Sequence, residues 1–163
     1  SNNTIFKPGS RFLFETDINN LNIKEDVEIG FVGGSAFDGA NITNLNLPND
    51  LKYLWDRSFI SANITNLNLP DGIESIGAYA FLEANIANIT LPNSLKSIGA
   101  AAFRGDGNQE INITIPYNVT NIGAGAFGNR KGTVTFLRTE EDVKANVYLS
   151  PSWQGETTVL YAK

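Results

Sequence analysis

The sequence predicts a right-handed solenoid of short β-strands and tight helical turns, with about five coils and a cap at each end. Two regular spacings indicate it. Phenylalanines recur 22 residues apart and then once 24 apart, at Phe37, Phe59, Phe81, Phe103 and Phe127. Prolines repeat the 22, 22 and 24 spacing, at Pro48, Pro70, Pro92 and Pro116. One such unit cannot bury its own apolar side, whereas stacked units can.

Each copy predicts the same local elements in the same order. In residues 63–84, NITNLNLPDGIESIGAYAFLEA, the alternation before the proline indicates a short strand. The proline ends it because proline cannot donate to a ladder. The turn residues PDG follow, then a second short strand in GIESI and a tight helical turn in GAYAF. A 22-residue period lies in the range of leucine-rich repeats, so we expect each strand to pair with its equivalent in the next coil.

Stacking in register predicts columns of inward side chains. The expected columns are Leu45, Leu67, Ile89, Ile113; Leu47, Leu69, Leu91, Ile115; Leu54, Ile76, Ile98, Ile122; and the five phenylalanines. Small residues precede three of the phenylalanines, at Ala80, Ala102 and Ala126. Outside the core, Lys52, Glu74 and Lys96 occupy successive second strands, where opposite charges stabilise the register.

The chain is expected to form a single domain over residues 1–163. Residues 1–17 are strand-like and aromatic, which suits a lid on the first coil, and residues 18–132 hold the repeats. Residues 133–163 read as a strand, a helix and a closing strand. Thr139 is the predicted N-cap of that helix, and Asp142 stands in the capping-box position.

Composition excludes several functional classes. The net charge is −5 and no basic stripe is present, which argues against nucleic-acid binding. No apolar run approaches the roughly 20 residues of a membrane span. The chain has no Cys and no His, so Ser-His, Cys-His and histidine-metal centres cannot be built. The remaining carboxylates are scattered, so we predict no enzyme activity, catalytic residue or cofactor.

Residues 91–103, LPNSLKSIGAAAF, and residues 115–127, IPYNVTNIGAGAF, resemble the BspA-like (Treponema-type) leucine-rich repeat. The resemblance covers about residues 18–137. Members often have Cys three residues after the Phe, where this chain has Ala40, Ala62, Ala84 and Asp106. The resemblance implies a bacterial protein, secreted or on the cell surface, that binds proteins or cell surfaces. A host-matrix adhesin is one such role. No signal peptide or anchor is recognisable in the chain.

An asparagine column on the main strands is the first candidate binding surface. Asn20, Asn44, Asn66, Asn88 and Asn112 recur at one position, beside a second column of Asn22, Asn46, Asn68, Thr90 and Thr114. One interpretation is an amide ladder that holds the sheet in register. The other is a flat, uncharged face that docks a protein or a glycan through many hydrogen bonds.

A second candidate lies where one copy departs from the pattern. Trp55 stands at the position of Gly77, Gly99 and Gly123 in later copies, and Tyr53 and Arg57 flank it. These residue types dominate binding energies at interfaces. The alternative is that Trp55 fills the space over Gly33 and Gly34 of the preceding coil.

A third candidate is the tripeptide Arg104-Gly105-Asp106, the motif that integrins recognise. It falls at the ordinary bend between two coils, which is the simpler interpretation. Asp106, Asn108 and Glu110 offer three oxygens, fewer than a calcium ion takes, so no metal site is predicted.

The sequence therefore favours a non-catalytic extracellular or cell-surface module that binds a protein partner. The alternatives are a passive structural spacer on the cell surface and a carbohydrate-binding face.

Overall fold

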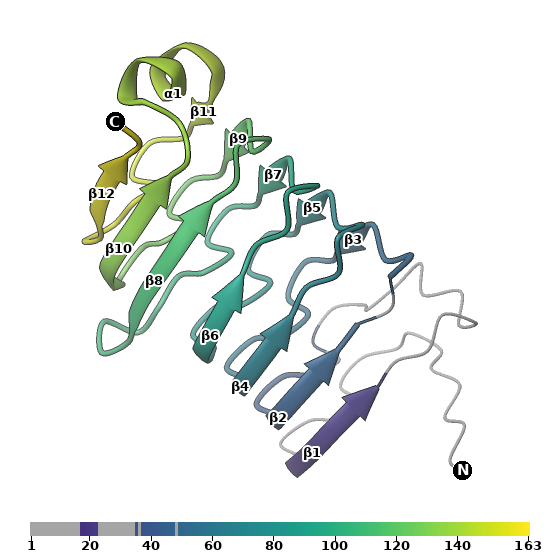
Figure 1. The fold of residues 1–163 in the computed structure, drawn as a ribbon. Helices are drawn as coiled ribbons and strands as arrows, with labels where there is room; N and C mark the ends of the chain where they lie inside the picture. The colour runs from purple at the N-terminus through teal and green to yellow at the C-terminus, as the bar shows by residue number, and fades with distance from the viewer. Residues whose placement is uncertain (1–16, 23–34, 36, 48) are drawn as a thin grey trace.

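A computed structural model describes residues 17–22, 35, 37–47 and 49–163 of the chain. The predicted N-terminal lid therefore lies almost wholly outside the described residues. The described part is a solenoid of about five turns, made mostly of parallel strands (Figure 1). The predicted leucine-rich-repeat solenoid is confirmed.

One long strand per coil forms the main face of the solenoid. These strands make two parallel sheets, in the orders β1-β2-β4-β6 and β12-β10-β8. Their bounds are β1 Asp17–Asn22, β2 Asn41–Asn46, β4 Asn63–Asn68, β6 Asn85–Thr90, β8 Glu110–Ile115, β10 Lys131–Phe136 and β12 Thr158–Tyr161. The pairing keeps the repeat in register, for example Leu45 opposite Leu67 and Leu67 opposite Ile89.

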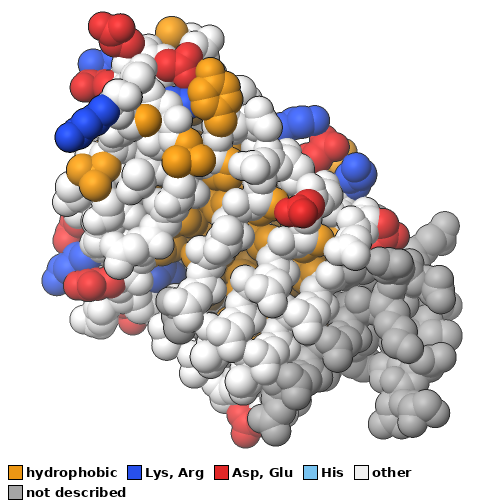
Figure 2. All heavy atoms as spheres, viewed as in Figure 1, with side chains coloured by type: hydrophobic (Ala, Val, Ile, Leu, Met, Phe, Trp, Pro, Cys, Tyr) orange, Lys and Arg blue, Asp and Glu red, His pale blue; other side chains and the backbone are white. Residues whose placement is uncertain are grey.

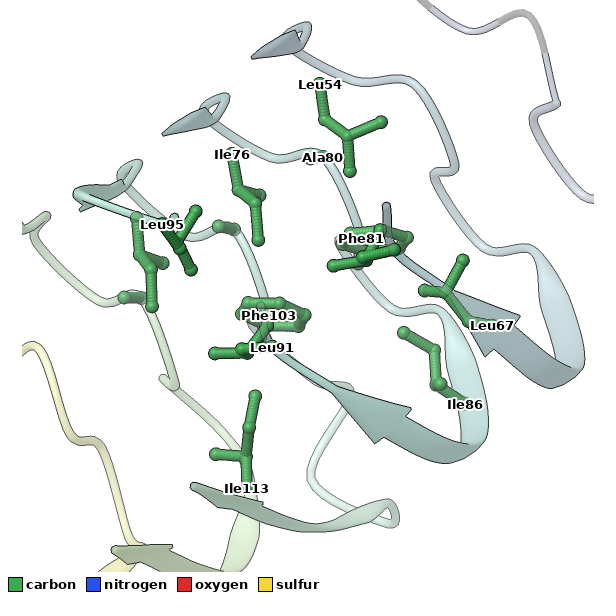
Figure 3. Close-up of a cluster of buried hydrophobic side chains, with 14 of the residues drawn as sticks. Leu54, Leu67, Ile76, Ala80, Phe81, Ile86, Leu91, Leu95, Phe103 and Ile113 are labelled. Atoms are coloured by element: carbon green, nitrogen blue, oxygen red, sulfur yellow. The ribbon is translucent and has the colours of Figure 1, made fainter. Parts of the chain in front are cut away.

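Five short strands form a third parallel sheet, called the second sheet below because it contains the second strand of each coil, in the order β11-β9-β7-β5-β3. The strands are β3 Tyr53–Leu54, β5 Ser75–Ile76, β7 Ser97–Ile98, β9 Asn121–Ile122 and β11 Tyr148–Leu149. The predicted column of Leu54, Ile76, Ile98 and Ile122 is buried, and Figure 3 shows Leu54 and Ile76 in the core.

The predicted phenylalanine column is confirmed as a continuous stack inside the solenoid (Figure 3). Phe81 lies 5.3 Å from Phe59 and 5.3 Å from Phe103 between ring centroids, with the rings nearly parallel. Phe37 and Phe127 extend the stack at its two ends. Burying one such ring stabilises the fold by roughly 1.5–3 kcal/mol in transfer free energy.

The segment before each phenylalanine forms hydrogen-bonded turns that join neighbouring coils. Ala80 N–H donates to the Gly77 carbonyl within the turn, and Tyr79 N–H donates to Ala100 of the next coil over 2.9 Å. Tyr79 has a positive φ of 58°, and Ala101 has one of 51° at the same place in the next coil. With these residues in the left-handed region, every second N–H of the turn donates to a carbonyl of the adjacent coil. Hydrogen bonds therefore join the turns of neighbouring coils, as they join neighbouring strands.

Glycine is required where the coils approach most closely. A Cβ on Gly99 would lie 2.5 Å from the backbone nitrogen of Ala78, and one on Gly123 would lie 2.4 Å from that of Ala100. Real Cβ contacts are never so short, so a side chain here would push the two coils apart.

The C-terminal residues cover the last coil. Helix α1, Glu140–Asn146, begins after Thr139, whose hydroxyl accepts from the Asp142 N–H as predicted. The reciprocal half of the capping box is absent, because the Asp142 carboxylate accepts from Arg138 and Asn146 instead. Trp153, which the sequence analysis did not single out, meets both Phe127 and Phe136 edge-on and ends the aromatic stack.

The main face is divided between β6 and β8. The sequence predicted that every long strand pairs with its equivalent in the next coil, and this is wrong here, since β6 and β8 end separate sheets among the described strands (Figure 1). Ile89, predicted to be inward, is only partly buried as a result. None of the described helices is long and apolar enough to cross a membrane.

Two local differences explain the division. Ile113 follows Phe103 by ten residues, whereas Ile89 follows Phe81 by eight. The buried residues of β4 are three apart, at Ile64 and Leu67, but those of β8 alternate strictly. Strands whose inward residues differ in spacing cannot pair along their length with all of those residues in the core.

Candidate interaction surface

The exposed side of the long strands presents the predicted asparagine column. Asn66, Asn88 and Asn112 are exposed and Asn44 is partly buried, all on strands of the main face. The side chain of Asn20 lies outside the described residues. Strands β2, β4 and β6 contain no charged residue, so the centre of this face is polar and uncharged.

Part of the column is an amide ladder. Asn66 Nδ2 donates to Asn44 Oδ1 over 2.9 Å, and Asn68 donates to Asn46 over 3.3 Å. At the start of the strands, Asn85 donates to Asn63 over 3.0 Å. These bonds tie the side chains of neighbouring strands and stabilise the parallel register.

The column behaves differently next to the division. The amides of Asn88 on β6 and Asn112 on β8 make no side-chain hydrogen bond to any residue that the structure describes. In the column of Asn44, Asn66 and Asn88 the ladder therefore ends on β4, although Asn85 at the start of β6 still bonds to Asn63.

The predicted aromatic group lies on the second sheet and not on the main face. Tyr53 and Trp55 are 50% and 40% exposed, with ring centroids 6.4 Å apart. The guanidinium of Arg57 lies over the Tyr79 ring, 5.4 Å from its centroid. The structure thus groups Tyr53 with Trp55 but does not bring them to the asparagine column. Gly33 and Gly34, the predicted neighbours of Trp55, lie outside the described residues.

The predicted charge alternation on the second strands is confirmed. Glu74 lies between two lysines, 2.8 Å from Lys96 Nζ and 3.7 Å from Lys52 Nζ. The hydrogen bond from Lys96, and then its charge, lower the pKa of Glu74 below its ordinary value. All three side chains are solvent-accessible, so we assign them to the register of the sheet.

The tripeptide Arg104-Gly105-Asp106 is built into the coil stack. Gly105 is buried and its N–H donates to the Gly128 carbonyl, while Glu83 N–H donates to the Arg104 carbonyl. A Cβ on Gly105 would meet the side chain of Arg130 at 2.7 Å. Glycine is thus explained at this position by packing.

Asp106 stands near a buried cation that the sequence analysis did not single out. Arg130 is buried and donates to the carbonyls of Ala84 and Phe103, so it bridges two earlier coils. Burial lowers the pKa of Arg130 to about 10, and the Asp106 carboxylate acts in the opposite direction. Arg130 thus stays charged at neutral pH, with Asp106 as a stabilising neighbour.

The described residues hold no group of three His, Cys, Asp or Glu side chains that could bind a metal ion. Asp106 instead accepts from the Asn108 N–H over 2.8 Å within its own bend. A cavity of about 400 Å³ lies at the division of the main face, and Asn112 is among its lining residues.

The family comparison gives a match over most of the chain. The model described as BspA type leucine-rich repeat region matches residues 7–134 in six copies. It begins inside the range predicted as the N-terminal lid. Neither the curated proteins nor the solved structures gave a match.

Proposed function

The chain belongs to the BspA-type leucine-rich-repeat family, and from that premise we propose that it binds a protein partner on the exposed face of its long strands. Leucine-rich repeats typically mediate protein binding, and a solenoid of this kind generally acts as a scaffold and not as an enzyme. We extend this to a non-catalytic interaction module.

The observation that supports this surface is its composition. The long strands present exposed Asn and Thr side chains on parallel sheets, without charge on β2, β4 or β6. Such a face offers donors and acceptors at a spacing set by the strands, about 4.8 Å from one to the next. Because the sheet is ordered before binding, little conformational entropy is lost on association.

The aromatic group is the second candidate surface. Tyr53 and Trp55 are half-exposed, and Arg57 stacks on Tyr79 nearby. Aromatic and Arg side chains often dominate interface energies. We place Arg104-Gly105-Asp106 outside the proposed surface, because Gly105 packs against Arg130 and Asp106 stands near that buried cation.

Members of this family are typically associated with the cell surface. We propose an extracellular or cell-surface location, with extracellular-matrix proteins of a host as the first partners to test. A spacer and a glycan-binding face are the competing functions.

The test is binding of the purified chain to arrays of matrix proteins and of glycans. For any partner found, Asn66→Lys places a charge at the centre of the main face. A partner on this face would bury that charge without a counter-charge, which should weaken binding at least about tenfold. Asn121→Lys makes the same change on the exposed side of the second sheet and should leave binding unchanged.

The outcomes separate the functions. Binding to a matrix protein that Asn66→Lys weakens and Asn121→Lys does not supports the proposal. Binding to glycans alone favours the carbohydrate-binding function, and an absence of binding on both arrays favours the spacer.

A further inference from the structure

Strand β12 has one neighbour among the described strands. The order β12-β10-β8 places it at the end of its sheet, and Figure 1 shows no strand or helix beyond it on that side. We propose that two copies of this chain associate through this edge, with β12 of one copy paired antiparallel with β12 of the other. This inference goes beyond the proposed function and concerns a different surface of the molecule.

The backbone groups of β12 are directed for such pairing. The Ala162 N–H donates to the Phe136 carbonyl over 3.1 Å, so the even-numbered residues of this segment direct their backbone groups to β10. Backbone groups alternate in direction along a regular strand. Val159 and Tyr161 therefore direct their N–H and C=O groups to the open edge, where they can donate to and accept from a further strand.

The residues of β12 do not protect this edge. Natural proteins block an open edge with charged side chains, with proline or with a covering element, because it is a template for pairing with another chain. Strand β12 has the sequence TVLY, without charge or proline. Leu160 on its outer side is 49% exposed, and Figure 2 shows hydrophobic side chains at the surface of this end of the solenoid.

One antiparallel register matches the side chains of two copies. When Leu160 lies opposite Leu160 of the second copy, Val159 lies opposite Tyr161 of that copy, and the arrangement is two-fold symmetric. Val159 and Tyr161 are only partly buried against the core, so the pairing covers their remaining surface. Contacts between aromatic and β-branched residues across an antiparallel pair are stabilising.

Opposite charges at the two ends of β12 favour a second copy as the occupant. Glu156 precedes the strand and Lys163 follows it; both are exposed, and neither forms an ion pair with a residue that the structure describes. Antiparallel pairing brings Glu156 of each copy to the end at which Lys163 of the other lies. Parallel pairing would instead place like charges together, which is unfavourable.

This association extends the main face and does not cover it. Opposite residues of an antiparallel pair point to the same side, so the outer faces of both copies lie on one side of a continuous sheet. The dimer thus presents the surface of the proposed function twice, and a partner with repeated sites is bound with avidity. Only this consequence rests on the proposed function.

Sedimentation equilibrium of the purified chain tests the association. A dimer should form, and its share should rise with protein concentration. Because a short strand edge buries little surface, we expect a dissociation constant between about 10 µM and 1 mM.

Two leucine variants test whether the contact involves β12. Leu160→Lys places two like charges opposite each other and should weaken the dimer at least about tenfold. Leu137→Lys is the matched control, because Leu137 is 51% exposed and follows β10, one strand further from the edge. It should change the dissociation constant less than about twofold. Thermal unfolding of both variants checks that each remains folded.

Charge exchange tests the orientation of the two strands. Glu156→Lys alone, or Lys163→Glu alone, places like charges at both ends of the antiparallel pair and should weaken it at least about twofold at low salt. An equimolar mixture of the two single variants restores opposite charges and should form mixed dimers as tight as those of the natural chain. Parallel pairing places identical residues together, so neither single variant would weaken it.

Hydrogen exchange locates the contact on the backbone. The N–H groups of Val159 and Tyr161 should gain protection as the protein concentration rises through the dissociation constant. Those of Thr158 and Leu160 face β10 and should be protected at every concentration.

A dimer that Leu160→Lys weakens and Leu137→Lys does not, with added protection of Val159 and Tyr161, supports the inference. A chain that is monomeric at about 1 mM overturns it. A dimer that Leu160→Lys leaves intact, or one without added protection of Val159 and Tyr161, also overturns it. Growth beyond a dimer indicates a head-to-tail contact and overturns it as well. Binding on the arrays does not depend on these outcomes.

Discussion

At the residue scale, Phe81 shows what holds neighbouring coils together. It lies between Phe59 and Phe103 with centroids 5.3 Å from each, and none of its surface reaches solvent. Removing the ring leaves a cavity that the rigid coils on either side cannot fill. Phe81→Ala should therefore lower the free energy of unfolding by about 3–5 kcal/mol, measured by urea denaturation.

Tyr79→Ala is the matched control in the same turn. Tyr79 is 38% exposed, and Ala101 occupies the same left-handed position one coil later. Its ring is partly exposed and stacks with Arg57 on the surface, so the change should cost less than about 1 kcal/mol. Equal losses for Tyr79→Ala and Phe81→Ala would contradict a buried stack.

At the element scale, one buried tryptophan in the C-terminal cap closes the phenylalanine stack. Trp153 is buried against Phe127 and Phe136, and its carbonyl accepts from the Phe127 N–H over 2.8 Å. Terminal coils of a solenoid need such a cover because their apolar side is otherwise open. Trp153→Ala should lower the free energy of unfolding by about 3–5 kcal/mol and make the segment after β10 accessible to protease.

Tyr148→Ala tests whether that effect belongs to the cap as a whole. Tyr148 lies on β11 of the same cap and is 65% exposed. Its removal should change stability by less than about 0.5 kcal/mol. If Trp153→Ala were equally mild, the cap would be held by α1 and the strand pairing alone.

At the scale of the whole molecule, the divided main face predicts uneven hydrogen exchange. Leu137 N–H donates to the Ile115 carbonyl, so the odd-numbered residues of β8 direct their backbone groups to β10. The N–H of Ile113 therefore faces the paired strand, whereas that of Thr114 faces the edge of β8 that ends the sheet. Thr114 should exchange at least about a hundredfold faster than Ile113 in NMR measurements. In β4, which is paired on both sides, Leu67 and Asn68 should both be protected. Similar protection of Ile113 and Thr114 would show that β6 and β8 pair in solution.

Much of the fold could be predicted because the repeat places chemically equivalent residues at equivalent positions. The phenylalanine column, the second-strand column and the Glu74 ion pairs all follow from a period of 22 residues. The candidate site was predicted less well. The sequence suggests one uniform asparagine column. In the structure a side-chain hydrogen bond joins Asn66 to Asn44, whereas Asn88 and Asn112 make none to a described residue.

The sequence by itself determined the period, most of the inward columns and the absence of charge on β2, β4 and β6, because these depend only on which residues recur. The tertiary structure decided where the stack is interrupted. Two extra residues before Ile113 and the altered spacing of inward residues in β8 are visible in the sequence. Their effect depends on the adjacent coil, because strand pairing is a relation between two chain segments and each must present its backbone groups in the same register.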